Sequence, residues 1–113
     1  MPVHQLRIYE VDPTKRVAFH ERFRDHATRI MSAHGFRILA MWETRSDDRL
    51  EFVYLLEWCD RHALDRGWAA FMADESWSAI KQDVRAAVGG EPVLSVSDRV
   101  LEVVDYPPYR LST

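Results

Sequence analysis

The chain has 113 residues, the size of one ordinary domain, and is long enough to bury a substantial core. A net charge of −3 and a pI of about 5.9 exclude the basic surface that nucleic-acid or anionic-membrane binding requires. The single cysteine, Cys59, excludes an intramolecular disulfide and favours a reducing compartment. With no signal-peptide pattern and no apolar stretch of membrane-spanning length, we expect a cytoplasmic protein without nucleic-acid or membrane partners.

The first part of the chain predicts a strand followed by a long helix. Residues 3–11 alternate in polarity, which is the period of a strand. Asp12 and Pro13 end that strand and supply an N-cap and a proline in the first helical turn. Apolar residues then recur at helical spacing, so we expect one amphipathic helix over 13–34, ended by Gly35. The side chains expected on its wet side are Glu21, Arg22, Arg24, Asp25 and Arg29.

Residues 36–58 predict the central β-hairpin. Two runs rich in large apolar and aromatic residues flank the polar break at 45–49, and we expect strands over 36–45 and 50–58. Both faces of both runs carry apolar residues, whereas a sheet with water on one side alternates cleanly. We therefore expect one face to be covered by helices of the same chain and the other by something else.

The second half of the chain predicts two short helices and a last strand. Asp60 and Asp74 are expected to cap helices over 60–73 and 75–87. Gly67 is expected to weaken the first of these by about 1 kcal/mol relative to Ala. A strand over 93–103 completes a single domain over 1–105, and residues 106–113 are expected to form an extended tail.

The resulting order, β-α-β-β-α-β, predicts an α+β, ferredoxin-like fold: a four-stranded antiparallel sheet with helices on one face. The uncovered face would be too apolar for a soluble monomer, so we expect a homodimer that stacks sheet on sheet. The register that decides which face this is cannot be derived from the sequence. The interface residues expected are Leu6, Ile8, Val53 and Leu55, or their neighbours one position away.

The order and spacing of five segments resemble those of NIPSNAP-domain proteins over roughly residues 3–103. The segments are Leu6–Val11, Phe19–Ala27 with His34-Gly35, Trp42 before Glu43-Thr44, Val53–Trp58, and the turn Asp74–Trp77. The resemblance implies a dimeric α+β barrel with a pocket between helices and sheet in each subunit. It implies no single activity, because the family has no single established one.

Three polar residues are candidates for catalysis. His26 lies one turn from Phe23 and Ile30, where it would be a general acid or base, or else a hydrogen-bonded histidine at the core margin. Arg7 and Tyr9 share one face of the first strand. They would hold an anionic oxygen if that face meets the helices, and would otherwise be an edge pair in which Tyr9 packs.

A high content of large aromatic residues suits a pocket for a flat organic ligand, although plain core packing is the more common role for most of them. The residues considered for substrate binding are Trp42, Tyr54, Phe23, Trp68 and Trp77. The remaining histidines, at positions 4, 20, 34 and 62, lack metal-ligand spacing, so we expect no metal ion and no other cofactor.

Two functions from different classes follow. The first is a small cofactor-independent enzyme, of monooxygenase or isomerase type, acting on an aromatic or polyketide-like metabolite. In it His26 would move a proton while Arg7 and Tyr9 hold an anionic oxygen, and it rests partly on the fold that the resemblance implies. The second is a non-catalytic protein that binds a small ligand or a partner. A cavity that places titratable groups beside a ligand favours the first, and a filled interior favours the second.

Overall fold

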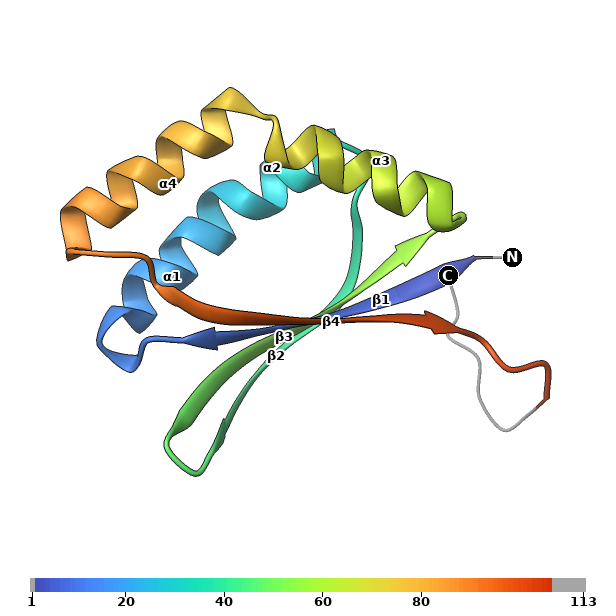
Figure 1. Ribbon diagram of the computed structural model, residues 1–113, viewed down its shortest axis with the longest axis horizontal. Helices are drawn as coiled ribbons and strands as arrows, with labels where there is room; N and C mark the ends of the chain where they lie inside the picture. The colour runs from blue at the N-terminus through green and yellow to red at the C-terminus, as the bar shows by residue number, and fades with distance from the viewer. Residues whose placement is uncertain (1, 107–113) are drawn as a thin grey trace.

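The computed structural model describes residues 2–106. Figure 1 shows one four-stranded sheet with the helices lying over one of its faces. The predicted element order and the α+β, ferredoxin-like architecture of one chain are therefore confirmed. The predicted tail over 106–113 lies, apart from its first residue, outside the described residues. Within the described part of the chain, no helix is long and apolar enough to cross a membrane.

Each strand end lies within one residue of its predicted position. The strands are β1 (Val3–Val11), β2 (Arg37–Ser46), β3 (Arg49–Trp58) and β4 (Val93–Glu102). Their order across the sheet is β2-β3-β1-β4, and every neighbouring pair is antiparallel. Because β1 pairs on both edges, its side chains meet those of both β3 and β4.

The predicted helix over 13–34 is one helical stretch with an irregular middle. It consists of a 3-10 turn (Pro13–Lys15), α1 (Arg16–Arg22), a π-helical segment (Phe23–Ala27) and α2 (Thr28–Ala33). The π segment departs from the regular helix that we predicted. A π turn holds more residues than an α turn, so it changes which side chains face the sheet. Phe23 and Ala27 are buried, and His26 between them is half-buried.

The two later helices are α3 (Arg61–Met72) and α4 (Glu75–Val88), again within one residue of the predicted ends. Their caps are the predicted ones. The Asp60 carboxylate accepts the backbone N–H of Ala63 at 2.7 Å, and that of Asp74 accepts the N–H of Trp77 at 3.0 Å.

The strand register settles which face of the sheet the helices cover. Arg7 lies opposite Tyr54 on β3 and opposite Asp98 on β4, and Tyr9 follows it on the same face. The alternate positions of β3 that share this face, Tyr54 among them, are buried. The core therefore lies between this face and the helices.

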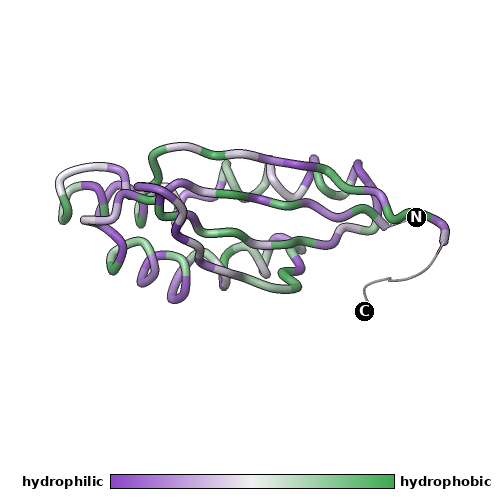
Figure 2. The backbone as a smooth tube through the Cα atoms, turned by 90° about the horizontal axis from the view of Figure 1, so that it is seen from below, coloured by the Kyte–Doolittle hydropathy of each residue, from purple (hydrophilic) through white to green (hydrophobic). Residues whose placement is uncertain are grey.

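The opposite face of the sheet lies away from the helices, and we call it the open face. Leu6 faces Leu55 there, and Ile8 faces Val53, which also pairs with Trp42 of β2. Figure 2 looks onto the strands from this side and shows hydrophobic segments along them. The four residues expected to meet a second chain therefore share the uncovered face, while the dimer itself stays a prediction.

Gly67 has a packing role that the sequence did not indicate. A Cβ atom at this position would lie 2.5 Å from Cη2 and Cζ3 of the Trp58 side chain. Trp58 is 4% exposed and packs edge-on against Phe36. The missing side chain lets α3 approach β3 closely, so Gly67 is a packing requirement as well as a weak helix former.

Candidate functional site

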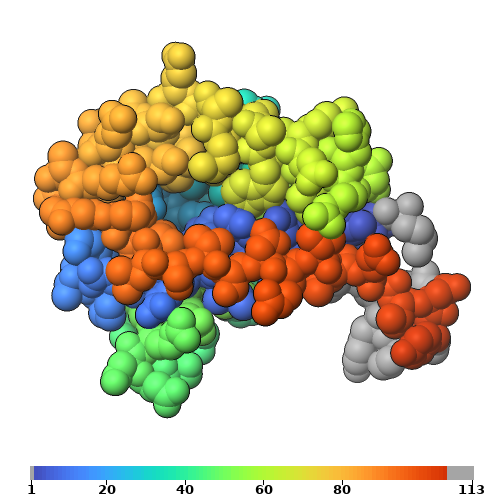
Figure 3. Space-filling view, viewed as in Figure 1, coloured from blue at the N-terminus to red at the C-terminus, as the bar shows by residue number. Residues whose placement is uncertain are grey.

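A cleft of about 270 Å³ lies between the covered face of the sheet and the helices α3 and α4. We call it the interior cleft. Figure 3 shows a hollow between α4 and the strand β4 below it. Five of the residues selected from the sequence line this cleft together, and they come from β1, the π segment, α3 and α4. They are Arg7, Tyr9, Phe23, Trp68 and Trp77.

Arg7, Tyr9 and Tyr54 form a hydrogen-bonded chain. Arg7 Nη2 donates to the Tyr9 hydroxyl at 3.4 Å, and the hydroxyl oxygens of Tyr9 and Tyr54 are 2.6 Å apart. Tyr54 is fully buried, and among the described residues the Tyr9 oxygen is the one acceptor that its hydroxyl meets, so its proton is satisfied only if it is donated to Tyr9. The Tyr9 oxygen then accepts both bonds, and its own proton is available to a ligand in the cleft.

The Arg7 guanidinium is a fixed cation. Nη1 donates to Asp98 Oδ2 at 2.7 Å, and the guanidinium carbon lies 4.2 Å from the centroid of the Trp68 ring. Burial alone would lower the pKa of Arg7, but its interactions with Tyr9, Tyr54 and Asp98 outweigh burial and raise that pKa. Nε is buried without a hydrogen-bond partner in the described part of the chain, which leaves one donor unsatisfied.

Gln5 holds the aromatic part of this cluster in place. Its amide nitrogen donates to Asp98 at 2.8 Å. Its amide oxygen accepts the indole N–H groups of Trp58 at 3.0 Å and Trp68 at 2.7 Å. Gln5 is 2% exposed, so these bonds satisfy a buried amide and fix the ring on which Arg7 rests. Sequence reasoning missed Gln5, although its two-residue spacing from Arg7 places both on one strand face.

A second group of charges borders the far side of the cleft. Arg22 donates two hydrogen bonds of 3.0 Å to the carboxylate of Glu91. Partial burial alone would raise the pKa of Glu91, but its hydrogen bonds with Arg22 and the Val93 N–H outweigh burial and hold that pKa at about 2. Lys81 lines the same cleft, has no ion pair among residues 2–106, and has its pKa lowered mainly by burial.

The expectation that Arg22 lies on the wet side of the first helix was wrong, because its side chain is only 5% exposed. Its guanidinium lies 5.5 Å from the centroid of the Trp77 ring on α4. The sequence signal for this burial is spacing: Arg22 follows buried Phe19 by three residues, so both lie on neighbouring positions of one helix face. The cleft therefore combines aromatic walls with three cationic side chains and two carboxylates, Asp98 and Glu91, that pair with two of them.

The structure does not bring His26 or Trp42 to this cleft. His26 borders a separate small hollow between the first helix and α4, and its Nδ1 lies 3.2 Å from Arg29 Nη2. Trp42 is 51% exposed on the open face. Tyr54 lies behind Tyr9 and reaches the cleft only through that hydroxyl. Burial raises the pKa of Tyr54, so it remains a neutral phenol.

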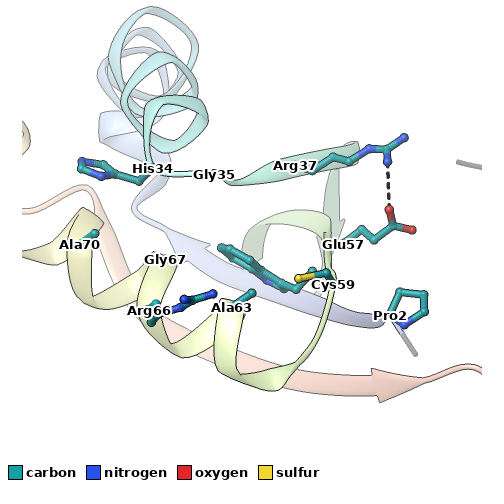
Figure 4. Close-up of a pocket in the computed structure, with 11 residues that line it drawn as sticks. Pro2, His34, Gly35, Arg37, Glu57, Cys59, Ala63, Arg66, Gly67 and Ala70 are labelled. Atoms are coloured by element: carbon teal, nitrogen blue, oxygen red, sulfur yellow. Dashed lines mark hydrogen bonds and ion pairs between the residues drawn. The ribbon is translucent and has the colours of Figure 1, made fainter.

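A larger hollow of about 720 Å³ lies at the opposite end of the fold, between the start of β2 and α3. Figure 4 shows Cys59 and Arg66 at this hollow, and Arg37 paired with Glu57 at its edge. Cys59 is exposed and has no hydrogen-bond partner among the described residues. Arg37 and Glu57 pair with each other, and this hollow presents no set of reactive groups comparable to the Arg7 cluster.

Within residues 2–106, no group of three or more His, Cys, Asp and Glu side chains is placed to hold a metal ion. The polar groups that converge on the interior cleft are instead hydrogen-bond donors and cations, which suit an anionic oxygen of an organic ligand.

Comparisons with known proteins agree with this architecture. A NIPSNAP-like domain protein from Burkholderia xenovorans superposes with a TM-score of 0.76 at 17% identity, covering 96% of this chain and 90% of that one. A NIPSNAP family protein from Agrobacterium tumefaciens gives a TM-score of 0.80 at 14% identity, covering 97% and 100%. A protein described as an antibiotic biosynthesis monooxygenase gives 0.58 at 16% identity, covering 90% and 98%. At these identities the structural likeness establishes the fold alone.

A search of curated proteins found no match. The family model of NIPSNAP matches residues 4–108, nearly the whole chain. This match includes the strand that carries Arg7 and Tyr9 and the helices that close the interior cleft. The chain therefore belongs to the NIPSNAP family.

Proposed function

We propose that the interior cleft binds a small aromatic metabolite through an anionic oxygen. The observation that carries this proposal is the Arg7 guanidinium, fixed on the Trp68 ring beside the Tyr9 hydroxyl at the wall of the cleft. A carboxylate, phenolate or enolate would be attracted to this cation and would accept the Tyr9 proton. Phe23 and Trp77 supply the apolar walls for the ring of such a ligand.

The size of the cleft limits the ligand. Its volume of about 270 Å³ lies just below the range of roughly 300–1,000 Å³ that is usual for small-molecule sites. A single aromatic ring or a compact pair of fused rings suits this space better than an extended polycyclic molecule.

The chemistry that this arrangement supports is stabilisation of an oxyanion. A cofactor-independent oxygenase uses the enolate or phenolate of its own substrate to reduce dioxygen: a CH₂ group becomes C=O, and the second oxygen atom leaves as water. An isomerase uses the same anion without oxygen. One structural neighbour is described as an antibiotic biosynthesis monooxygenase, which supports the first possibility by analogy of fold.

The alternative is a protein that binds this ligand without reaction, and one observation favours it. The carboxylate that lines the cleft, Glu91, has a pKa near 2 and is bonded to Arg22, so it is a poor proton acceptor. A substrate that is already ionised at neutral pH requires no base. A neutral carbon acid would bind here without being deprotonated.

The open face supports the proposal that the functional unit is a homodimer. Leu6, Ile8, Val53 and Leu55 form an apolar centre on that face, and the ion pair of Arg37 with Glu57 lies at its margin. A second copy stacked on this face would remove these side chains from water. The cytoplasm remains the proposed location, since the cysteine is a free and exposed thiol.

The proposed binding is tested by calorimetry with 1-hydroxy-2-naphthoate, using its neutral carboxamide as the matched ligand. We expect the anion to bind more tightly, and Arg7→Met to weaken the anion by about tenfold or more while leaving the carboxamide nearly unchanged. Arg61→Met is the control, because Arg61 is exposed and pairs with Asp65 away from the interior cleft. Equal affinities of the parent protein and Arg7→Met for the anion would refute the proposal. Oxygen consumption in the presence of an enolisable aromatic ligand separates the enzyme from the binding protein.

A further inference from the structure

A further hollow, of about 760 Å³, lies on the outer side of the first helix, against the edge strand β2. We call it the outer hollow. Its apolar walls come from Val17, Phe23, Met41 and Phe52, and His20 borders it. Phe23 also lines the interior cleft and is 5% exposed, so its ring separates the two spaces.

The outer hollow contains a histidine paired with a carboxylate. His20 Nε2 lies 2.9 Å from Glu43 Oε1, and Arg16 donates to both oxygens of Glu43 at 2.8 and 2.9 Å. The bonds from Arg16 and His20 lower the pKa of Glu43 to about 2. At neutral pH Glu43 is therefore ionised and can only accept, so Nε2 of His20 must carry the hydrogen that joins them.

This tautomer leaves the Nδ1 lone pair of a neutral His20 ring unused. Nδ1 has no hydrogen-bond partner among the described residues. The ring packs edge-on against Phe19 at 5.3 Å and Phe52 at 5.9 Å between centroids, so its orientation is fixed from two sides. A carboxylate that orients a histidine and balances the charge of its protonated form is the arrangement of a general base.

The surroundings of the dyad suit an apolar ligand better than water. Val17 and Met41 border the hollow and are 65% and 50% exposed. Leaving large apolar side chains in water on both walls of one hollow is energetically unfavourable. The π-helical segment begins at Phe23, and Phe23, Arg24 and the following Thr28 all line the same hollow. Such segments occur frequently at functional sites.

We propose that the outer hollow is a second small-molecule site, at which His20 is the general base for an apolar molecule with an enolisable carbonyl group. Nδ1 takes the proton from the carbon beside the carbonyl, and the C–H electron pair becomes the C=C bond of the enolate. Glu43 balances the imidazolium charge that forms. The imidazolium then returns a proton to carbon or to oxygen, so the step needs no other reactant.

The proposal is tested with 2-tetralone as the probe, in deuterated buffer, by following the loss of its α-proton signals in NMR spectra. We expect the parent protein to accelerate this exchange. His20→Gln should lower the protein-dependent rate by about 100-fold, the usual contribution of a general base. His62→Gln, at an exposed histidine in the first turn of α3, is the matched control and should keep the parent rate.

Glu43 is a positioning residue in this proposal. Glu43→Gln should lower the turnover number for exchange with little change in KM, and Glu43→Asp should restore part of the rate. Val17→Trp, at an exposed wall of the hollow, should block the probe and raise KM. Saturation of the interior cleft with 1-hydroxy-2-naphthoate should leave exchange unchanged, which keeps this test separate from that of the cleft.

Exchange at the rate of buffer alone, or an equal rate in His20→Gln, would show that the dyad only ties the first helix to β2. Inhibition by the cleft ligand would place the reaction in the interior cleft and would also overturn the proposal. If His20→Gln does not fold, the ring signals of His20 in the parent protein decide. They must shift on addition of 2-tetralone, and an absence of shift refutes the site.

Discussion

The contact between Gly67 and Trp58 leads to a stability prediction that can be worked from two opposing terms. Replacing Gly67 by Ala improves helix propensity by about 1 kcal/mol. The new methyl group would lie 2.5 Å from two atoms of the Trp58 ring, closer than van der Waals contact allows. Overpacking of a core typically costs about 1–3 kcal/mol, and a rigid ring that is 4% exposed has little room to move. We therefore expect Gly67→Ala to lower the free energy of unfolding by up to about 2 kcal/mol.

The same contact predicts a reversal of sign in a second background. The two clashing atoms, Cη2 and Cζ3, belong to the outer ring of the indole, which Phe lacks. In a Trp58→Phe protein the clash is absent, and Gly67→Ala should then stabilise by up to about 1 kcal/mol. Urea unfolding of the four proteins gives the coupling energy, which equals the cost of the clash and is expected at about 1–3 kcal/mol.

A stabilising effect of Gly67→Ala in the parent background would refute this reasoning, as would a coupling energy near zero. The prediction also extends to the site. Trp58 shares the Gln5 oxygen with Trp68, so a displaced Trp58 ring should loosen the ring beneath Arg7. Ligand affinity in the cleft should fall together with stability.

Four further outcomes follow from the structure. Tyr54→Phe removes the partner of the Tyr9 hydroxyl, and we expect a loss of about 1 kcal/mol in unfolding free energy together with weaker ligand binding, both measurable by thermal melts with and without ligand. The depressed pKa of Glu91 contributes stability that is complete above its ordinary value of 4.5 and is lost as the pH falls toward 2. The Glu91→Gln protein should therefore be less stable than the parent at pH 7 by about 1–2 kcal/mol, and its stability should change less between pH 4.5 and 2. If the melting temperatures of the two proteins fall in parallel across that range, the role of the bond between Glu91 and Arg22 is contradicted. Val53→Asp on the open face should cause aggregation or unfolding if a second copy covers that face, and sedimentation showing a stable parent monomer would end the dimer proposal. His26→Ala should change the melting temperature and ligand affinity little, since His26 borders neither the interior cleft nor the outer hollow, and a loss of activity in this variant would restore it as a catalytic candidate.

The fold was predictable because each local signal agreed with the others. Asp60 and Asp74 cap their helices, and alternation in 3–11 gives the strand that carries Arg7 and Tyr9. The resemblance to the NIPSNAP family was confirmed by the match over residues 4–108. What the sequence could not supply was register, because a shift of one residue exchanges the two faces of a sheet.

The candidate site was predictable only in part, for two physical reasons. Arg7 and Tyr9 could be placed on one strand face. The charged residues that lie across the cleft from them come from α4 and the segment after it. Lys81 and Glu91 are distant in sequence and carry no motif. The π-helical segment interrupts the regular helix that the sequence pattern predicted, and His26 within it borders a hollow apart from the interior cleft.

The separation of the two spaces has an electrostatic basis. A histidine that accepts a proton becomes a cation, and its protonation is opposed by fixed positive charge nearby. The interior cleft, with Arg7, Arg22 and Lys81 around it, favours an anion and disfavours such a base. His20 lies across the Phe23 ring from these cations. The cations at its own hollow, Arg16 and Arg24, are each paired with a carboxylate, Glu43 and Asp25. The Phe23 ring thus separates the proposed anion site from the proposed basic dyad, and Lys81, which has no ion pair within the described part of the chain, lies on the cleft side of it.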